Sequence, residues 1–238
     1  MTALAVDRSP SATRSGLAIA AMTMRDRWRG MTIAAVSLGL MLPLAMAAYR
    51  SIDLALYDNL PEALRTLMGV PKGADIATLA YSVVFSSYGA LTIAGVAIAV
   101  GTALVAGEEG RGTLGVLLAN PVSRGRLLAA KTTALVGLVG AASALLWAVG
   151  RVSPVLLDVT ITGLHVGAFT VHFAASALLY GMFALAIGAW TGSRGAASGA
   201  ATAVMVIGFF ATGLLPLVSG AADLAKLFPW YYLGGSRP

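Results

Sequence analysis

The charged residues between positions 107 and 131 are the ones whose types and spacing could do chemical work. Glu108 and Glu109 form an acidic pair, and Arg124 and Lys131 follow on the far side of Asn120-Pro121. Carboxylates of this kind form charge-assisted hydrogen bonds with basic side chains, so they can pair with a basic rim on a partner protein. The set therefore indicates a contact region rather than a reaction centre.

The sequence offers almost nothing for catalysis or metal binding. It has no cysteine and only two histidines, which excludes thiol chemistry and leaves little for a zinc or iron site. The three lysines follow Pro71, Ala130 and Ala225, whereas a phosphate-binding loop places its lysine after glycine. We therefore expect no enzyme, no cofactor and no metal in this chain, and any ATP hydrolysis has to come from another polypeptide.

The composition places the elements that carry this region in a membrane. Of 238 residues, 58% are hydrophobic and 11% charged, far from the balance of a soluble domain, and the mean hydropathy is +0.84. Apolar runs long enough to cross a bilayer predict an all-α, polytopic helix bundle. Small residues at helical spacing are expected at helix contacts; they are Gly95 with Gly101, Gly137 with Gly140 and Ala144, Gly181 with Gly188, and Gly195 with Gly199. The five predicted spans cover about residues 31–49, 79–106, 132–150, 166–190 and 198–218.

The remaining segments divide the chain. Residues 1–30 read as a basic segment lying along the headgroups, and residues 31–238 as the transmembrane domain. Within that domain, residues 107–131 form a polar block and residues 219–238 an outer loop, whose aromatic cluster Trp230, Tyr231 and Tyr232 is expected at the outer interface.

Lysine and arginine positions predict the orientation. With a cytoplasmic N-terminus, the inside segments hold ten basic and four acidic residues, and the outside segments hold six of each. The excess of basic residues inside is the usual sign of a cytoplasmic side. The overall positive charge is thus explained by the membrane, and it requires no nucleic acid.

The predicted spans lack Asp, Glu, Lys and Arg through their central residues. An ion-coupled transporter usually holds such a group within the bilayer, so secondary coupling is disfavoured. His172, near the outer end of the fourth span, is the one ionisable residue within a span, and it is more typical of a packing residue than of a proton relay.

The polar block itself predicts two short helices. Leu114, Leu117 and Leu118 stand at i, i+3 and i+4, which gives the first helix one apolar edge, and Pro121 ends it. Ser123 is placed to cap the second helix. A helix–turn–helix joined to the second and third spans is suited to receive a push from a cytoplasmic partner.

This block resembles the coupling region of the permease subunits of type-two ATP-binding-cassette exporters, the drug- and antibiotic-efflux permeases among them. The shared pattern is an acidic pair, Gly-Thr-Leu, a leucine pair, a proline, a small polar residue, an arginine, and a lysine before the next span. The chain matches this pattern at Glu108, Glu109, Gly112, Thr113, Leu114, Leu117, Leu118, Pro121, Ser123, Arg124 and Lys131.

The resemblance implies a permease subunit in the cytoplasmic membrane of a bacterium that exports an amphipathic, drug- or lipid-like cargo. It implies two kinds of partner, namely cytoplasmic ATPase subunits that bind ATP and Mg, and a second permease copy, identical or related. The family has six spans, so we expect a chain that is truncated or completed by another subunit. The side chains expected to line the cargo path are Ser82, Ser86, Ser87, Tyr88, Phe209 and Phe210.

Two other functions compete with this interpretation. A membrane anchor or assembly subunit without transport of its own would be indifferent to charge reversal at Glu108 and Glu109. A secondary transporter would keep working after ATP depletion and stop with an ionophore, but the lack of buried charge counts against it.

Overall fold

The computed structural model describes residues 10–51, 53–68, 70, 72–110, 112, 123–161 and 165–233. Over these residues every regular element is a helix. Five helices are long and apolar enough to cross a membrane, which confirms the predicted all-α, polytopic bundle. They cover Gly16–Tyr49, Ile76–Leu104, Arg124–Leu156, Val166–Thr191 and Arg194–Leu217.

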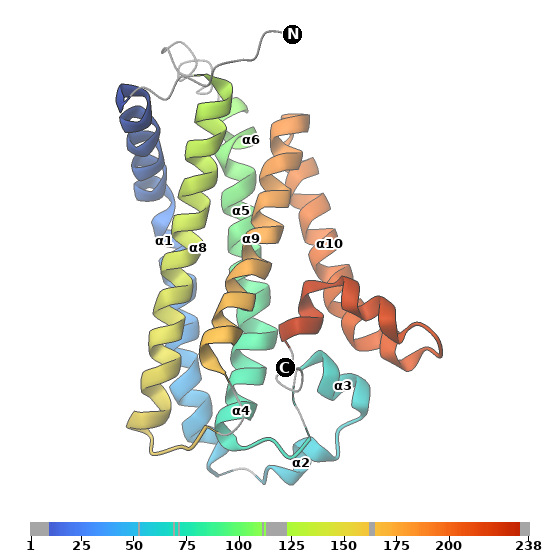
Figure 1. Cartoon of the computed structure of the whole chain (residues 1–238). Coiled ribbons are helices and arrows are strands. Elements are labelled where there is room, and N and C mark those ends of the chain that lie inside the picture. The colour runs from blue at the N-terminus through green and yellow to red at the C-terminus, as the bar shows by residue number, and fades with distance from the viewer. Residues whose placement is uncertain are drawn as a thin grey trace.

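The long helices run alternately up and down in Figure 1, beginning with α1 (Pro10–Tyr49), which descends. The second span rises through α4 (Ile76–Tyr81), η1 (Ser82–Gly89) and α5 (Ala90–Leu104) and leads into the short α6 (Ala106–Glu109). Helix α8 (Arg124–Leu156) descends, α9 (Val166–Thr191) rises and α10 (Arg194–Leu214) descends. The start of α1, α6, the start of α8 and the α9–α10 turn therefore share one end of the bundle, here called the coupling end.

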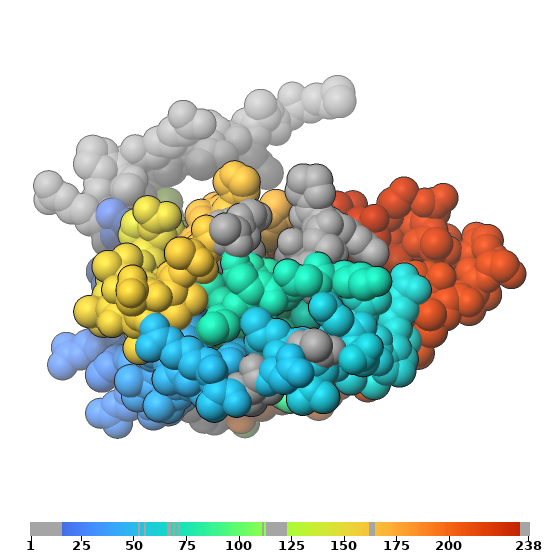
Figure 2. Space-filling model, turned by 90° about the horizontal axis from the view of Figure 1, so that it is seen from below, coloured from blue at the N-terminus to red at the C-terminus, as the bar shows by residue number. Residues whose placement is uncertain are grey.

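The opposite end carries the short elements. They are α2 (Ala55–Asp58), α3 (Glu62–Leu67), η2 (Leu215–Leu217), η3 (Ala222–Leu227) and η4 (Pro229–Leu233). Figure 2 looks onto this end, where the residues between α1 and α4 spread across the bundle with the end of α8 on one side and η2–η4 on the other. We call it the outer end, after the side of the membrane that the sequence predicts for it.

Helix α1 is continuous, although the sequence predicts an interfacial segment up to residue 30 and a span from residue 31. Its 40 residues correspond to a length of about 60 Å. The N-terminal half has its own partner, because Ala20 packs against Ala130 and Ala134 of α8. This contact keeps the first turns beside α8 instead of turning them away from the bundle (Figure 1).

Helices α5 and α9 form the centre of the bundle through small residues. A Cβ built on Gly101 would lie 2.1 Å from the carbonyl oxygen of Gly181, so the two backbones touch where neither residue has a side chain. Such close approach is how small residues bring membrane helices together. The predicted role of glycines at helix contacts is confirmed at this pair.

The second span is interrupted by the π-helical segment η1, whose hydrogen bonds reach five residues back. Its serines do not line an open cavity, so that expectation is wrong. Ser82, Ser86 and Ser87 are buried. The Ser86 hydroxyl donates to the carbonyl of Leu233 at 2.9 Å, and the Ser87 hydroxyl to that of Ser82 at 3.4 Å. Burial removes the hydrogen bonds that these hydroxyls would make to water, and hydrogen bonds to backbone carbonyls replace them.

The aromatic cluster near the C-terminal side also differs from the expectation of an interfacial belt. Trp230 is buried, its indole N–H donates to the carbonyl of Met205 at 3.2 Å, and its ring stacks on Tyr180. Tyr232 remains half exposed and lies parallel to the His172 ring. Segment η4 thus docks between the outer halves of α9 and α10, because an indole inside an apolar bundle needs an acceptor for its N–H.

Candidate functional site

The predicted coupling residues lie at the coupling end. The structure describes six of them and places these at the end of α6 and the beginning of α8. Thr113, Leu114, Leu117, Leu118 and Pro121 lie outside the described residues. The six that can be placed are Glu108, Glu109, Gly112, Ser123, Arg124 and Lys131.

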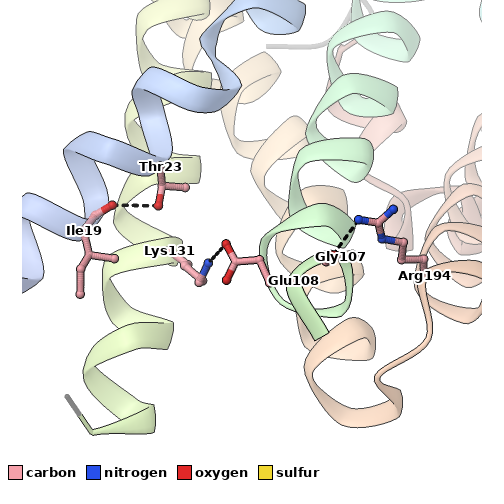
Figure 3. A network of polar contacts seen from close by, with 6 residues as sticks. All are labelled: Ile19, Thr23, Gly107, Glu108, Lys131 and Arg194. Atoms are coloured by element: carbon pink, nitrogen blue, oxygen red, sulfur yellow. Dashed lines mark hydrogen bonds and ion pairs between the residues drawn. The ribbon is translucent and has the colours of Figure 1, made fainter. Parts of the chain in front are cut away.

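An ion pair joins the two sides of this region. The Lys131 ammonium lies 2.5 Å from the Glu108 carboxylate, and the side chain of Lys131 is 1% exposed against 19% for Glu108. Figure 3 shows the two side chains pointing toward each other from α8 and α6. Within the chain, the Glu108 carboxylate pairs with a lysine that α8 buries among apolar helices, while its predicted contact with a partner protein stays a prediction. A buried lysine without such a partner would be strongly unfavourable.

A second contact joins α6 to the α9–α10 turn. The Arg194 guanidinium donates from Nη2 to the carbonyl of Gly107 at 2.7 Å, as Figure 3 shows. A Cβ on Gly107 would lie 2.7 Å from the same nitrogen, so a larger residue there would shift the guanidinium from this position. Two residues shape the turn that carries Arg194. Gly192 ends α9 in the left-handed conformation, with a φ of 64°. Ser193 caps α10, because its hydroxyl accepts a hydrogen bond from the Ala196 N–H.

Glu109 lies beside the same turn and stays exposed. Its carboxylate oxygen would be 2.9 Å from a Cβ on Gly192. The two glutamates of the acidic pair thus have different surroundings, since Glu108 faces α8 and Glu109 lies at the surface over the α9–α10 turn. Of the pair, Glu109 is the carboxylate that a protein docking at this end can reach.

The beginning of α8 follows the predicted capping. The Ser123 hydroxyl accepts from the Arg126 N–H at 3.3 Å, which satisfies one of the free amides of the first turn. The second helix of the predicted helix–turn–helix is not separate, however, because α8 continues from Arg124 through the membrane span to Leu156. Gly112, with a φ of 72°, follows α6 in a conformation that favours glycine.

Arg194 and Gly107 are the residues that the motif does not mark. In the sequence, Arg194 is simply a basic residue in a short turn. Its hydrogen bond to Gly107 joins positions 87 residues apart, so no local pattern indicates it. The available signal is that Arg194 is the one charged residue between the fourth and fifth predicted spans. A lone charge at such a tight turn is a candidate for a contact with the neighbouring turn.

At the coupling end, all five spans are thus linked. Glu108 and Lys131 join α6 to α8, Arg194 joins α6 to the α9–α10 turn, and Ala20 of α1 packs on the first turns of α8. The arrangement contains charge pairing and packing. Contacts of these kinds hold helices together.

Comparison with known proteins agrees with the residue pattern. The family model described as ABC-2 family transporter protein matches residues 17–229, which is most of the chain and includes all five spans and the region between α6 and α8. No curated protein and no solved structure gave a significant match. The chain belongs to the ABC-2 family of transporter proteins and is a multi-pass membrane permease of an ABC transporter.

Proposed function

We propose that the chain is the membrane-spanning subunit of an ATP-driven exporter, and that its coupling end receives the force. The observation that carries the proposal is the pair of links at α6. Glu108 joins this short helix to Lys131 of α8, and Gly107 joins it to Arg194 at the α9–α10 turn. A push on the segment between α6 and α8 would therefore reach α5, α8, α9 and α10 together.

The partner in this proposal is a pair of cytoplasmic ATPase subunits that bind ATP and Mg. The chain has no phosphate-binding loop of its own, so ATP hydrolysis belongs to them. The exposed carboxylate of Glu109 would pair with a basic rim on the ATPase. The residues that complete the docking segment are Gly112, Thr113, Leu114, Leu117, Leu118, Pro121, Ser123 and Arg124.

The orientation in the proposal puts the N-terminus and the coupling end in the cytoplasm of a bacterium. The excess of arginine and lysine over acidic residues in the segments at this end supports it. The structure brings the start of α1, α6 and the α9–α10 turn to one end, as this orientation requires (Figure 1).

A second permease copy, identical or related, would complete the transporter, and the cargo would move along the face between the copies. Large apolar side chains such as Tyr88 and Phe210 remain about half exposed on the spans. Such faces favour an amphipathic, drug- or lipid-like cargo. Closure of the ATPases on ATP would tilt α5 and α8 against the second copy and change access to this face.

The experiment is co-purification of the full chain with the ATPase encoded beside it, comparing the parent with three variants. Glu109→Lys reverses the exposed charge and is expected to lose the ATPase. Asp223→Lys, the matched control, reverses an exposed charge at the outer end and is expected to keep it. Glu108→Gln keeps the surface charge of Glu109 and is expected to bind the ATPase while failing to move in response to ATP.

Movement can be measured directly because the chain has no cysteine of its own. Spin labels on cysteines introduced at Ala129 and Ala196, both exposed, report the distance between α8 and α10. In the parent complex this distance should change when ATP is added, and in Glu108→Gln it should not. If no form retains an ATPase, the coupling proposal fails and the anchor or assembly function takes its place.

A further inference from the structure

An apolar groove of about 280 Å³ lies between α1 and α8, around the middle of both helices. Its walls come from two neighbouring helices and are apolar apart from one cation and one hydroxyl. The side chains that matter here are Arg25, Trp28 and Met31 of α1 and Leu138, Ala141 and Leu145 of α8.

The groove crosses the boundary between the polar and the apolar part of α1. Arg25 lies within the charged stretch that ends at Arg29, and Met31 begins the long apolar run. The groove extends from Arg25 to Ala35, which at 1.5 Å per residue is about 15 Å, or half of a hydrocarbon core of about 30 Å. Trp28 is half exposed and lies between Arg27 and Arg29, just before the apolar run, a sequence position typical of interfacial indole rings. The groove therefore reaches from the charged stretch of α1 into its apolar run.

Charge complementarity identifies the occupant as an anion. Among the described residues that line the groove, Arg25 alone is charged. It is exposed, and its side chain has no ion pair or hydrogen bond with the residues that the structure describes. Arg126 of α8 reaches the same seam, since its Cγ lies 3.8 Å from a Cβ built on Gly16. The other exposed charged residues on this part of the two helices are Arg29 and Arg124, which are basic, and Asp26, which is acidic.

The geometry points to a binding site for one anionic phospholipid in this groove. The Arg25 guanidinium binds the headgroup phosphate, which its planar donors suit better than an ammonium would. Trp28 lies beside the glycerol region, and one acyl chain runs along Met31, Leu138 and Leu145 in contact with apolar side chains. The site lies on α1 and α8 and does not depend on the coupling proposal, because no ATPase takes part in it.

The test uses the full chain purified in a mild detergent, with phosphatidylglycerol, phosphatidylcholine and inorganic phosphate as separate probes. Native mass spectrometry counts retained lipid, and thermal unfolding measures stabilisation. We expect one phosphatidylglycerol per chain and a larger rise in melting temperature with it than with phosphatidylcholine. Inorganic phosphate alone is expected to give no rise; an equal rise would overturn the lipid assignment in favour of a free anion.

Two pairs of variants separate the site from a general attraction of lipid to basic helices. Arg25→Gln should weaken phosphatidylglycerol binding about tenfold, the value of one charged hydrogen bond. Arg27→Gln is the control, because it makes the same charge change about 200° around the helix. Ala141→Leu fills the groove and should displace both lipids, whereas Ala148→Leu, exposed on α8 beyond the groove, should displace neither.

Equal losses in Arg25→Gln and Arg27→Gln would overturn the proposal. So would unchanged lipid retention in Ala141→Leu, since a filled groove cannot hold an acyl chain. Neither readout involves ATP or the ATPase, so failure here is distinguishable from failure of the coupling experiment.

Discussion

The link between Glu108 and Lys131 is open to a quantitative test by Glu108→Gln. The change removes one charge and leaves Lys131, whose side chain is 1% exposed, without its counter-charge. Breaking a buried pair from one side costs about 3–5 kcal/mol. The Glu108 side chain is 19% exposed, so water relieves part of that cost and we expect a value near ~3 kcal/mol. For a chain of this size that is a fall in melting temperature of roughly 6–12 °C.

A double-mutant cycle shows whether the cost belongs to the pair. Lys131→Met leaves Glu108 with access to water and should cost less than Glu108→Gln. The cycle consists of Glu108→Leu alone, Lys131→Met alone and the double variant Glu108→Leu, Lys131→Met. The double variant removes both charges and should return to within about 1 kcal/mol of the parent, because apolar replacement of a buried pair is often nearly neutral.

The measurement is the thermal unfolding of the full chain in detergent, followed by the fluorescence of its four tryptophans. Strictly additive losses in the double variant would refute the reasoning, since two independent residues share no pair energy. An unchanged melting temperature in Glu108→Gln would refute it as well.

Three further changes test the packing and the helix ends. Gly101→Ala puts a Cβ 2.1 Å from the carbonyl oxygen of Gly181, so the yield of monodisperse protein in size-exclusion chromatography should fall severely; Gly95→Ala, which meets open space, should match the parent, and equal yields would contradict the close approach. Ser123→Ala removes the cap of α8 at a cost of about 1 kcal/mol, seen as a drop in melting temperature of roughly 2–4 °C; no drop would mean that the cap contributes nothing. Trp230→Phe keeps an aromatic ring and loses the hydrogen bond to the α10 backbone, so proteolysis between residues 218 and 228 should become faster, and an unchanged rate would show that the bond does not hold η4 in place.

The fold was predictable because bilayer crossing depends on length and apolarity, both of which are visible in the residues. The predicted fourth span, about 166–190, compares with Val166–Thr191 in the structure. Two helices begin earlier than the predicted spans, because residues 10–30 join the first span and Arg124 to Lys131 join the third. Periodicity does not distinguish a helix that continues from one that stops and turns, unless a proline or glycine marks the break.

The internal partners could not be predicted in the same way. The motif indicates that Glu108 and Lys131 belong to one functional region, but which carboxylate faces inward depends on where α6 ends against α8. The contact of Arg194 with Gly107 depends on the packing of two turns that are distant in the sequence. The buried serines of η1 find their acceptors only through the π-helical geometry and the docking of η4, and neither leaves a local pattern.

The hydrogen bond from Ser86 to the carbonyl of Leu233 spans 147 residues, which has a consequence for the order of synthesis. The second span must enter the bilayer long before its acceptor has left the ribosome. Until translation reaches Leu233, the Ser86 hydroxyl has only backbone carbonyls of its own helix to satisfy it. The indole pocket on α10 likewise stays empty until Trp230 emerges. A nascent chain halted before these residues would hold its spans in the membrane while the outer end of its second span remained without its native partner.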